Sequence, residues 1–154
     1  MGTQTPEERI KELGLSLPDP PQPAGSYIPC VRAGKLLFVS GMLPKKGGAV
    51  ISGKLGKDIT VEQAQDAARI ALLSALSAIK GELGALDKIK RIVRLSGYVR
   101  SHEGFSDQHK VMDGASDLLR DIFGERGLHS RVSVGVPDLP LQAVLELELV
   151  VEVE

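Results

Sequence analysis

Two stretches rich in β-forming residues lie near the carboxyl end of the sequence, on either side of Pro137-Asp138-Leu139-Pro140. The first stretch carries one arginine, Arg131, and the second carries Glu146 and Glu148 among leucines. A guanidinium can hold a carboxylate through two parallel hydrogen bonds, and a glutamate can orient or deprotonate a water molecule. A cation and carboxylates set into a sheet are therefore a candidate site for a small carboxylate-bearing molecule.

The two stretches predict an antiparallel hairpin. If residues 137–140 form its loop, counting outward along the strands places Arg131 opposite Glu146. The simplest interpretation of that pair is a cross-strand ion pair, which contributes less than ~1 kcal/mol on an exposed surface. The functional interpretation has Arg131 bind a carboxylate while Glu146 activates water. Spacing alone leaves both interpretations open, and Glu148 lies farther from Arg131 on the same face as Glu146.

The rest of the chain must supply the elements that position these residues. Alternation of apolar residues predicts strands, and capping residues with apolar residues at helical spacing predict helices. Before the closing hairpin we expect strands at 27–31, 35–40 and 49–52, a helix at 60–83, a strand at 89–100 and a helix at 106–123. This order predicts an α+β fold, a single mixed sheet with two helices on one face. We expect the uncovered face to meet another subunit.

The first 24 residues differ in composition from the rest of the chain. Thr5 and Glu8 form a capping box at the start of a short helix that ends at Gly14. The segment 18–23 is too rich in proline for a helix or a central strand. We therefore predict an N-terminal extension at 1–24, a short helix plus a proline-rich segment, and one domain at 25–154.

Composition excludes several classes of protein. A formal net charge of −1 disfavours a nucleic-acid binder, and no apolar run approaches the ~20 residues of a membrane helix. A single cysteine, Cys30, and the lack of an apolar signal-peptide region predict a cytoplasmic protein with no membrane partner. Cys30 is expected in the core rather than as a nucleophile, and the three histidines lack metal-ligand spacing, so no metal site is expected.

Several motifs occur together and in a fixed order along the chain. Val39-Ser40-Gly41 is followed by Pro44, Ser130-Arg131 by Val134-Gly135-Val136 and Leu139-Pro140, and Glu146-Leu147-Glu148 closes the series. From Tyr27 to Val151 the chain thereby resembles the YjgF/RidA family of reactive-intermediate (enamine/imine) deaminases. The stretch 105–119 is similar to a less-studied branch of that family.

The resemblance implies a fold, an assembly and a chemistry for the domain at 25–154. The fold would be chorismate-mutase-like and the assembly a homotrimer, whose sheets form a central barrel with ligand sites in clefts between subunits. The reaction would be hydrolysis of 2-aminoacrylate-type enamines and imines to 2-keto acids and ammonia, without a cofactor. Arg131 would hold the substrate carboxylate and Glu146 the attacking water. Tyr27, Ser40, Gly41 and Ser133 would line the substrate site.

Some residues depart from the family pattern. Ser133 stands where cysteine is common, Met42 stands where glutamine is usual, and the loop at 100–104 is unlike the main branch. Two rival functions follow: a non-catalytic module that binds small carboxylates in the same clefts, and an endoribonuclease or translation inhibitor. The second rival is supported by a basic cluster on the strand at 89–100 and the residue before it, Lys88, Lys90, Arg91 and Arg94.

Overall fold

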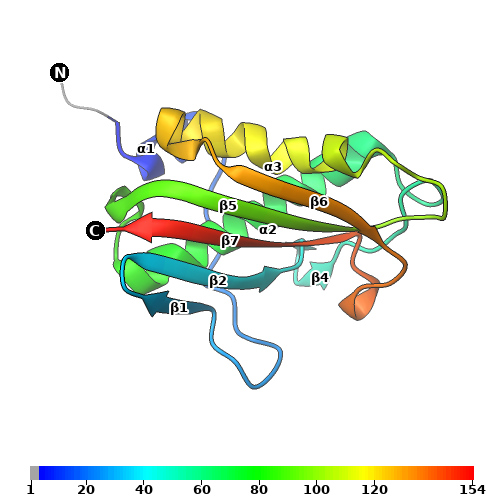
Figure 1. Ribbon diagram of the computed structural model, residues 1–154, viewed down its shortest axis with the longest axis horizontal. Helices are drawn as coiled ribbons and strands as arrows, with labels where there is room; N and C mark the ends of the chain where they lie inside the picture. The colour runs from blue at the N-terminus through cyan, green and yellow to red at the C-terminus, as the bar shows by residue number, and fades with distance from the viewer. Residues whose placement is uncertain (1–3) are drawn as a thin grey trace.

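The architecture is a mixed sheet with helices on one face (Figure 1). It comes from a computed structural model that describes residues 4–154. The five-stranded sheet has the order β1-β2-β7-β5-β6. Its strands are β1 (Cys30–Ala33), β2 (Leu36–Met42), β5 (Ile89–Arg100), β6 (Ser130–Val136) and β7 (Leu145–Val153). The predicted α+β fold is confirmed.

The long helix predicted at 60–83 begins at its capping box and ends before Gly84, as expected, whereas the helix predicted at 106–123 begins two residues later. In α2 (Val61–Leu83), the Thr60 side chain accepts from the Gln63 backbone N–H at 3.1 Å, and the Gln63 side chain accepts from the Thr60 N–H at 3.0 Å. The second long helix is α3 (Gln108–Phe123), and a short helix, α1 (Pro6–Glu12), has the predicted capping box at Thr5. Figure 1 shows α2 and α3 side by side on one face of the sheet.

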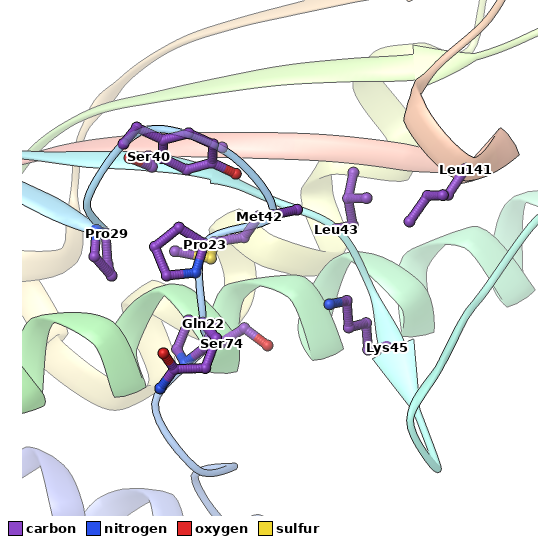
Figure 2. Close-up of a pocket in the computed structure, with 13 residues that line it drawn as sticks. Gln22, Pro23, Pro29, Ser40, Met42, Leu43, Lys45, Ser74 and Leu141 are labelled. Atoms are coloured by element: carbon purple, nitrogen blue, oxygen red, sulfur yellow. The ribbon is translucent and has the colours of Figure 1, made fainter.

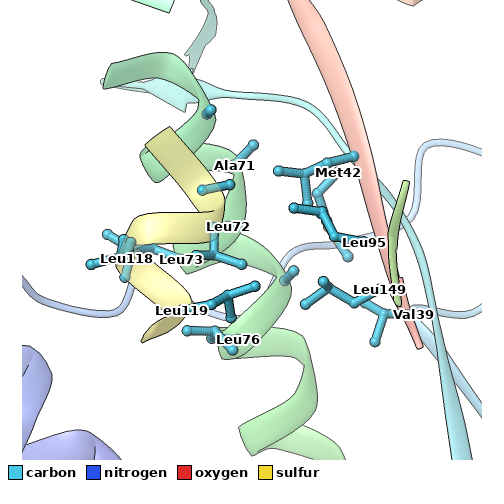
Figure 3. Packing of buried hydrophobic residues seen from close by; sticks show 14 of the residues in the cluster. Val39, Met42, Ala71, Leu72, Leu73, Leu76, Leu95, Leu118, Leu119 and Leu149 are labelled. Atoms are coloured by element: carbon cyan, nitrogen blue, oxygen red, sulfur yellow. The ribbon is translucent and has the colours of Figure 1, made fainter. Parts of the chain in front are cut away.

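The core lies between these helices and the sheet. Along β7 every second side chain is buried, while Glu146, Glu148, Val150 and Glu152 are only half-buried on the other face. The face of the sheet that carries these four residues, opposite the helices, is called the open face below. Figure 3 shows leucines of both layers in contact across the core: Leu72, Leu76, Leu119, Leu95 and Leu149.

The predicted closing hairpin is wrong. β6 pairs in parallel with β5, and β7 pairs antiparallel with β5 on one side and β2 on the other. β5, α3 and β6 form a crossover unit, and a strand that returns through a helix pairs in parallel with the strand it left. The eight residues from Pro137 to Val144 then carry the chain past β5, so that β7 enters the middle of the sheet.

The N-terminal segment packs against the helical layer. Ile10 is buried, the Leu86 backbone N–H donates to Glu7 Oε1 at 2.8 Å, and the Ser77 hydroxyl donates to the Pro18 carbonyl at 2.6 Å. The predicted extension at 1–24 includes residues 1–3, which lie outside the described residues.

Two small elements complete the chain before α2: β3 (Lys45–Lys46) and β4 (Ala49–Val50), which form a separate ribbon. Within residues 4–154, no helix combines the length and the apolar character needed to cross a membrane.

Candidate functional site

A β-bulge in β2 places two predicted site residues together. The register between β2 and β7 shifts between Val39 and Met42, which are both buried in the core. Ser40 and Gly41 therefore lie where a regular strand would have a single outward residue. The Ser40 hydroxyl donates to the Ile28 carbonyl at 2.7 Å, which fixes the chain that enters β1.

Glu146 packs directly on Gly41. A Cβ atom at position 41 would lie 2.9 Å from the carboxyl carbon of Glu146, a distance that real side chains essentially never show. The absence of a side chain at Gly41 thus leaves the space that the carboxylate occupies. Although the sequence motif predicted a role for Gly41, its physical reason is this close approach across two strands.

The two glutamates of β7 differ in their surroundings. The Tyr98 hydroxyl donates to Glu148 Oε1 at 2.9 Å, and that hydrogen bond, together with burial, raises the pKa of Tyr98. Burial raises the pKa of the Glu146 carboxyl, and the nearby negative charge of Glu148 raises it further. A carboxylate with a raised pKa is a stronger base, so Glu146 is better suited than an exposed glutamate to accept a proton from water.

A pocket adjoins the bulge on the edge of β2 that β1 leaves uncovered (Figure 2). Its cavity volume is about 80 Å³, enough for several water molecules or a small organic molecule. Tyr27, Ser40 and Gly41 line it, and the proline-rich N-terminal segment forms one wall. The other lining residues are Pro21, Gln22, Pro23, Ala24, Pro29, Met42, Leu43, Lys45, Ser74 and Leu141.

Arg131 lies on the helical side of the sheet and is held by α3. Its Nη1 donates to Asp113 Oδ1 at 2.9 Å and to Ser116 Oγ at 3.0 Å, and its Nη2 donates to the His109 carbonyl at 3.2 Å. The Arg131 side chain is 23% exposed. Among the described residues no acceptor is found for its Nε, so the edge of the guanidinium formed by Nε and Nη2 can still bind a carboxylate.

The expected contact between Arg131 and Glu146 is therefore absent within one chain. Arg131 is paired along β5 with Leu95, and Glu146 with Tyr98, so the two residues lie on opposite faces of the sheet with β5 between them. Neighbouring strands are ~4.8 Å apart, which separates β6 from β7 by about 10 Å. Counting outward from residues 137–140 could not reveal this separation, because the predicted register assumed that the two strands flanking those residues pair with each other.

The six predicted residues form two groups. Tyr27, Ser40 and Gly41 line the pocket and Glu146 adjoins it, whereas Arg131 and Ser133 lie on β6 at the opposite edge of the sheet. The Ser133 hydroxyl oxygen is buried and has no hydrogen-bond partner within the described part of the chain.

Sequence reasoning missed the residues that hold Arg131. His109, Asp113 and Ser116 are spaced four and three residues apart, which places them on one face of α3. This spacing was visible in the sequence, but nothing there showed that the face meets β6. Ser116 Oγ also lies 2.9 Å from His129 Nε2. Ser116 therefore links Arg131 to His129, the residue just before β6.

Cys30 and the acidic and histidine residues offer little other chemistry. Cys30 is buried, and burial raises the pKa of its thiol to about 11, so the thiolate is scarce at neutral pH. No group of three or more potential metal ligands comes together in residues 4–154.

The model of one protein family, described as "YjgF/chorismate mutase-like, putative endoribonuclease", matches residues 7–153. The chain belongs to the YjgF family. "Protein TCP17" of Trypanosoma cruzi is 42% identical over 145 residues, which are 93% of this chain and 91% of that protein. A crystal structure of a Shewanella oneidensis MR-1 protein, named "a putative endoribonuclease", superposes with a TM-score of 0.94 at 39% identity. The match covers 97% of this chain and 100% of that one.

A more distant relative in the YjgF family carries the name of an enzyme. The 2-iminobutanoate/2-iminopropanoate deaminase of Dermatophagoides farinae is 26% identical over 140 residues, covering 91% of this chain and 95% of that protein. The predicted membership of the YjgF/RidA family is confirmed, and the chorismate-mutase-like fold with it. Relatives in this family bear both deaminase and endoribonuclease names.

Proposed function

We propose that this YjgF-family protein hydrolyses small carboxylated enamines and imines of the 2-aminoacrylate type to 2-keto acids and ammonia. The observation that carries the proposal is the setting of Glu146, a half-buried carboxyl of raised pKa packed on Gly41 beside a small pocket. The deaminase name of the Dermatophagoides farinae relative supports the same chemistry.

The proposed mechanism uses only side chains of the chain and water. Arg131 holds the substrate carboxylate through its free edge. Glu146 takes a proton from a water molecule as the water oxygen forms a bond to the imine carbon. The protonated Glu146 returns that proton to the nitrogen, which gives a carbinolamine. Glu146 then takes the proton of the new hydroxyl group and passes it to the amine as the carbon–nitrogen bond breaks, so that ammonia leaves and a 2-keto acid remains. An enamine first gains a proton at carbon from water and loses one from nitrogen to water, which converts it to the imine.

Arg131 and Glu146 act on one substrate only if two copies of the chain meet. Arg131 lies on one edge strand, and the pocket beside Glu146 adjoins the other edge. A contact between two different patches of identical chains is heterologous, and such contacts close into a ring when the rotation permits. We therefore propose a cyclic homotrimer with one cleft at each subunit boundary. The open face would line its centre as a barrel.

A coupled assay tests the deaminase. A dehydratase generates 2-aminoacrylate, and pyruvate release is followed with and without the protein. We expect the wild type to accelerate pyruvate release. In Arg131→Ala the rate of pyruvate release should fall at least ~100-fold, since a bidentate charged contact contributes about 3 kcal/mol. Arg91→Ala is the matched control, an exposed arginine of β5 that does not contact the pocket beside Glu146. No acceleration by the wild type, or equal rates in both variants, would contradict the proposal.

The family description and the Shewanella oneidensis structure's name favour endoribonuclease activity as a second candidate. The exposed side chains of Lys90 and Arg91 on β5 would contact the RNA backbone. RNA cleavage lost in Lys90→Ala and retained in Arg131→Ala would favour this candidate over the deaminase. A third outcome, Arg131-dependent binding of 2-keto acids without turnover of any substrate, would identify a carboxylate-binding module.

For each candidate we propose a cytoplasmic location, because a chain with a single free cysteine suits a reducing compartment.

A further inference from the structure

Lys45 brings a positive charge to the pocket beside the β2 bulge. It is the first residue of β3, and the backbone before it is fixed where the Ile51 N–H donates to the Pro44 carbonyl at 2.9 Å. Figure 2 shows its side chain directed toward the interior of the pocket, with the ammonium group leading. Within residues 4–154, Lys45 forms no ion pair with a carboxylate.

The surroundings of Lys45 define what kind of group suits the pocket. Pro23, Met42, Leu43 and Leu141 supply apolar walls. An apolar occupant would remove water from the ammonium group without replacing its hydrogen bonds, which is unfavourable. An anionic group would instead gain the attraction and the charge-assisted hydrogen bond of the ammonium group. The complementary ligand therefore has a short aliphatic stem and an acidic end.

We propose that Lys45 binds a second carboxylate, so that the preferred substrates are enamines and imines of 2-oxo dicarboxylic acids. This inference rests on the proposed function, in which a second copy's Arg131 holds the first carboxylate. The reacting carbon then lies near Gly41 and Glu146, and the side chain of the substrate extends along the apolar wall toward Lys45. Gly41 and Lys45 are four residues apart, which is at most about 14 Å of extended chain. The Lys45 side chain is directed into the pocket that Gly41 also lines, so a substrate side chain of a few carbons can lie between them.

The chain supplies a matched control for Lys45. Lys46 follows it in the same strand and is also exposed, but consecutive strand residues point to opposite faces, and Lys46 does not line the pocket. Lys45→Gln and Lys46→Gln therefore remove the same charge from the same ribbon, and only the first removes it from the pocket.

Calorimetric binding of two 2-oxo acids tests the inference without requiring turnover. We expect the wild type to bind 2-oxoglutarate about tenfold more tightly than 4-methyl-2-oxopentanoate, which has a side chain of similar size and no second charge. Lys45→Gln should abolish this preference, while Lys46→Gln should keep it. Circular dichroism of both variants establishes that the fold is intact.

The failures of the two proposals are distinguishable. Equal affinities for the two acids, or the same preference in both lysine variants, would overturn the dicarboxylate inference. If binding of both acids still depended on Arg131, the proposed role of Arg131 in holding the first carboxylate would stand, and the pyruvate-release assay would decide the deaminase activity separately. If neither acid bound to the wild type, both proposals would be overturned together.

Discussion

At the scale of single residues, the site depends on how α3 and β2 place individual groups. Asp113 and Ser116 hold one side of the Arg131 guanidinium, and its Nε has no acceptor among the described residues. Gly41 leaves room for the Glu146 carboxyl, which is thereby drawn into a partly desolvated position. Arg131 is thus oriented by residues of its own chain. The pKa of Glu146, by contrast, is raised by burial and by the negative charge of Glu148.

Glu146 is expected to make stability depend on pH. Its pKa is raised in the folded protein, so the carboxyl favours folding fully below its ordinary pKa, and that contribution is lost as pH rises through the folded pKa. Glu146→Gln should therefore have a higher Tm than the wild type at pH 8, and the difference should vanish near pH 4. Thermal unfolding across this range is the measurement, with Glu103→Gln in an exposed loop as the control. A Tm difference independent of pH would contradict the assignment.

Gly41→Ala tests the same contact from the other strand. The added methyl carbon would lie 2.9 Å from the Glu146 carboxyl group, so that side chain must move. We expect deaminase kcat to fall at least ~10-fold, because a displacement of about 1 Å in a catalytic group has large effects on rate. Gly47→Ala, at a position with open space around it, affects the turn but not the carboxylate. Unchanged kcat in Gly41→Ala would argue against Glu146 as the base.

At the scale of elements, the close packing of α2 on α3 sets the platform on which Arg131 is held. Alanines line the buried face of α2, and α3 contributes Gly114 where the two helices are nearest. A Cβ atom at position 114 would lie 2.5 Å from the Gln65 carbonyl oxygen, and backbone cannot move aside as a flexible side chain can. The position of α3, and with it that of Asp113, follows from this approach.

Gly114→Ala is expected to destabilise the protein by about 1–3 kcal/mol through overpacking, despite the better helix propensity of alanine. That loss lowers Tm by roughly 2–4 °C per kcal/mol for a chain of this size. Asp117→Ala, on the exposed face of the same helix, should change stability by less than ~0.5 kcal/mol. Chemical denaturation of both variants measures the difference. A Gly114→Ala protein as stable as the wild type would show that the helices can separate without cost.

At the scale of the whole molecule, the open face of the sheet exposes apolar side chains beside its glutamates. Phe38 is 46% exposed and Val134 is 40% exposed, on strands at either side of the sheet. Because the helices cover only the other face, we propose one explanation for this surface and for the two groups of site residues at the sheet edges, which is assembly with further copies.

We expect light scattering to give a mass of about three times the 16.4 kDa of one chain. Phe38→Glu should shift the protein toward monomers, since it replaces an exposed apolar side chain of the open face by a further negative charge beside the glutamates of β7. Leu13→Glu, at an exposed apolar position after α1, should leave the mass unchanged. A wild-type monomer at micromolar concentration would remove the shared cleft and the mechanism that depends on it.

The sequence alone determined the local elements and the types of residue that could carry the chemistry. Capping boxes located the start of α2, alternation located β5 and the buried side of β7, and the motifs around Arg131, Ser40 and Glu146 indicated the family. These features depend on neighbours within a few residues, which is why they can be inferred without a structure.

Only the tertiary structure decided which strands pair and which site residues lie together. The choice of β5 rather than β7 as the partner of β6 is set by the crossover through α3 and by burial of the long apolar β7 at the centre of the sheet, and both involve residues far apart in sequence. The same choice placed Arg131 on the helical side and Glu146 on the open face. It thereby replaced a predicted ion pair within one chain by two separate groups of residues, which the proposed trimer would bring together.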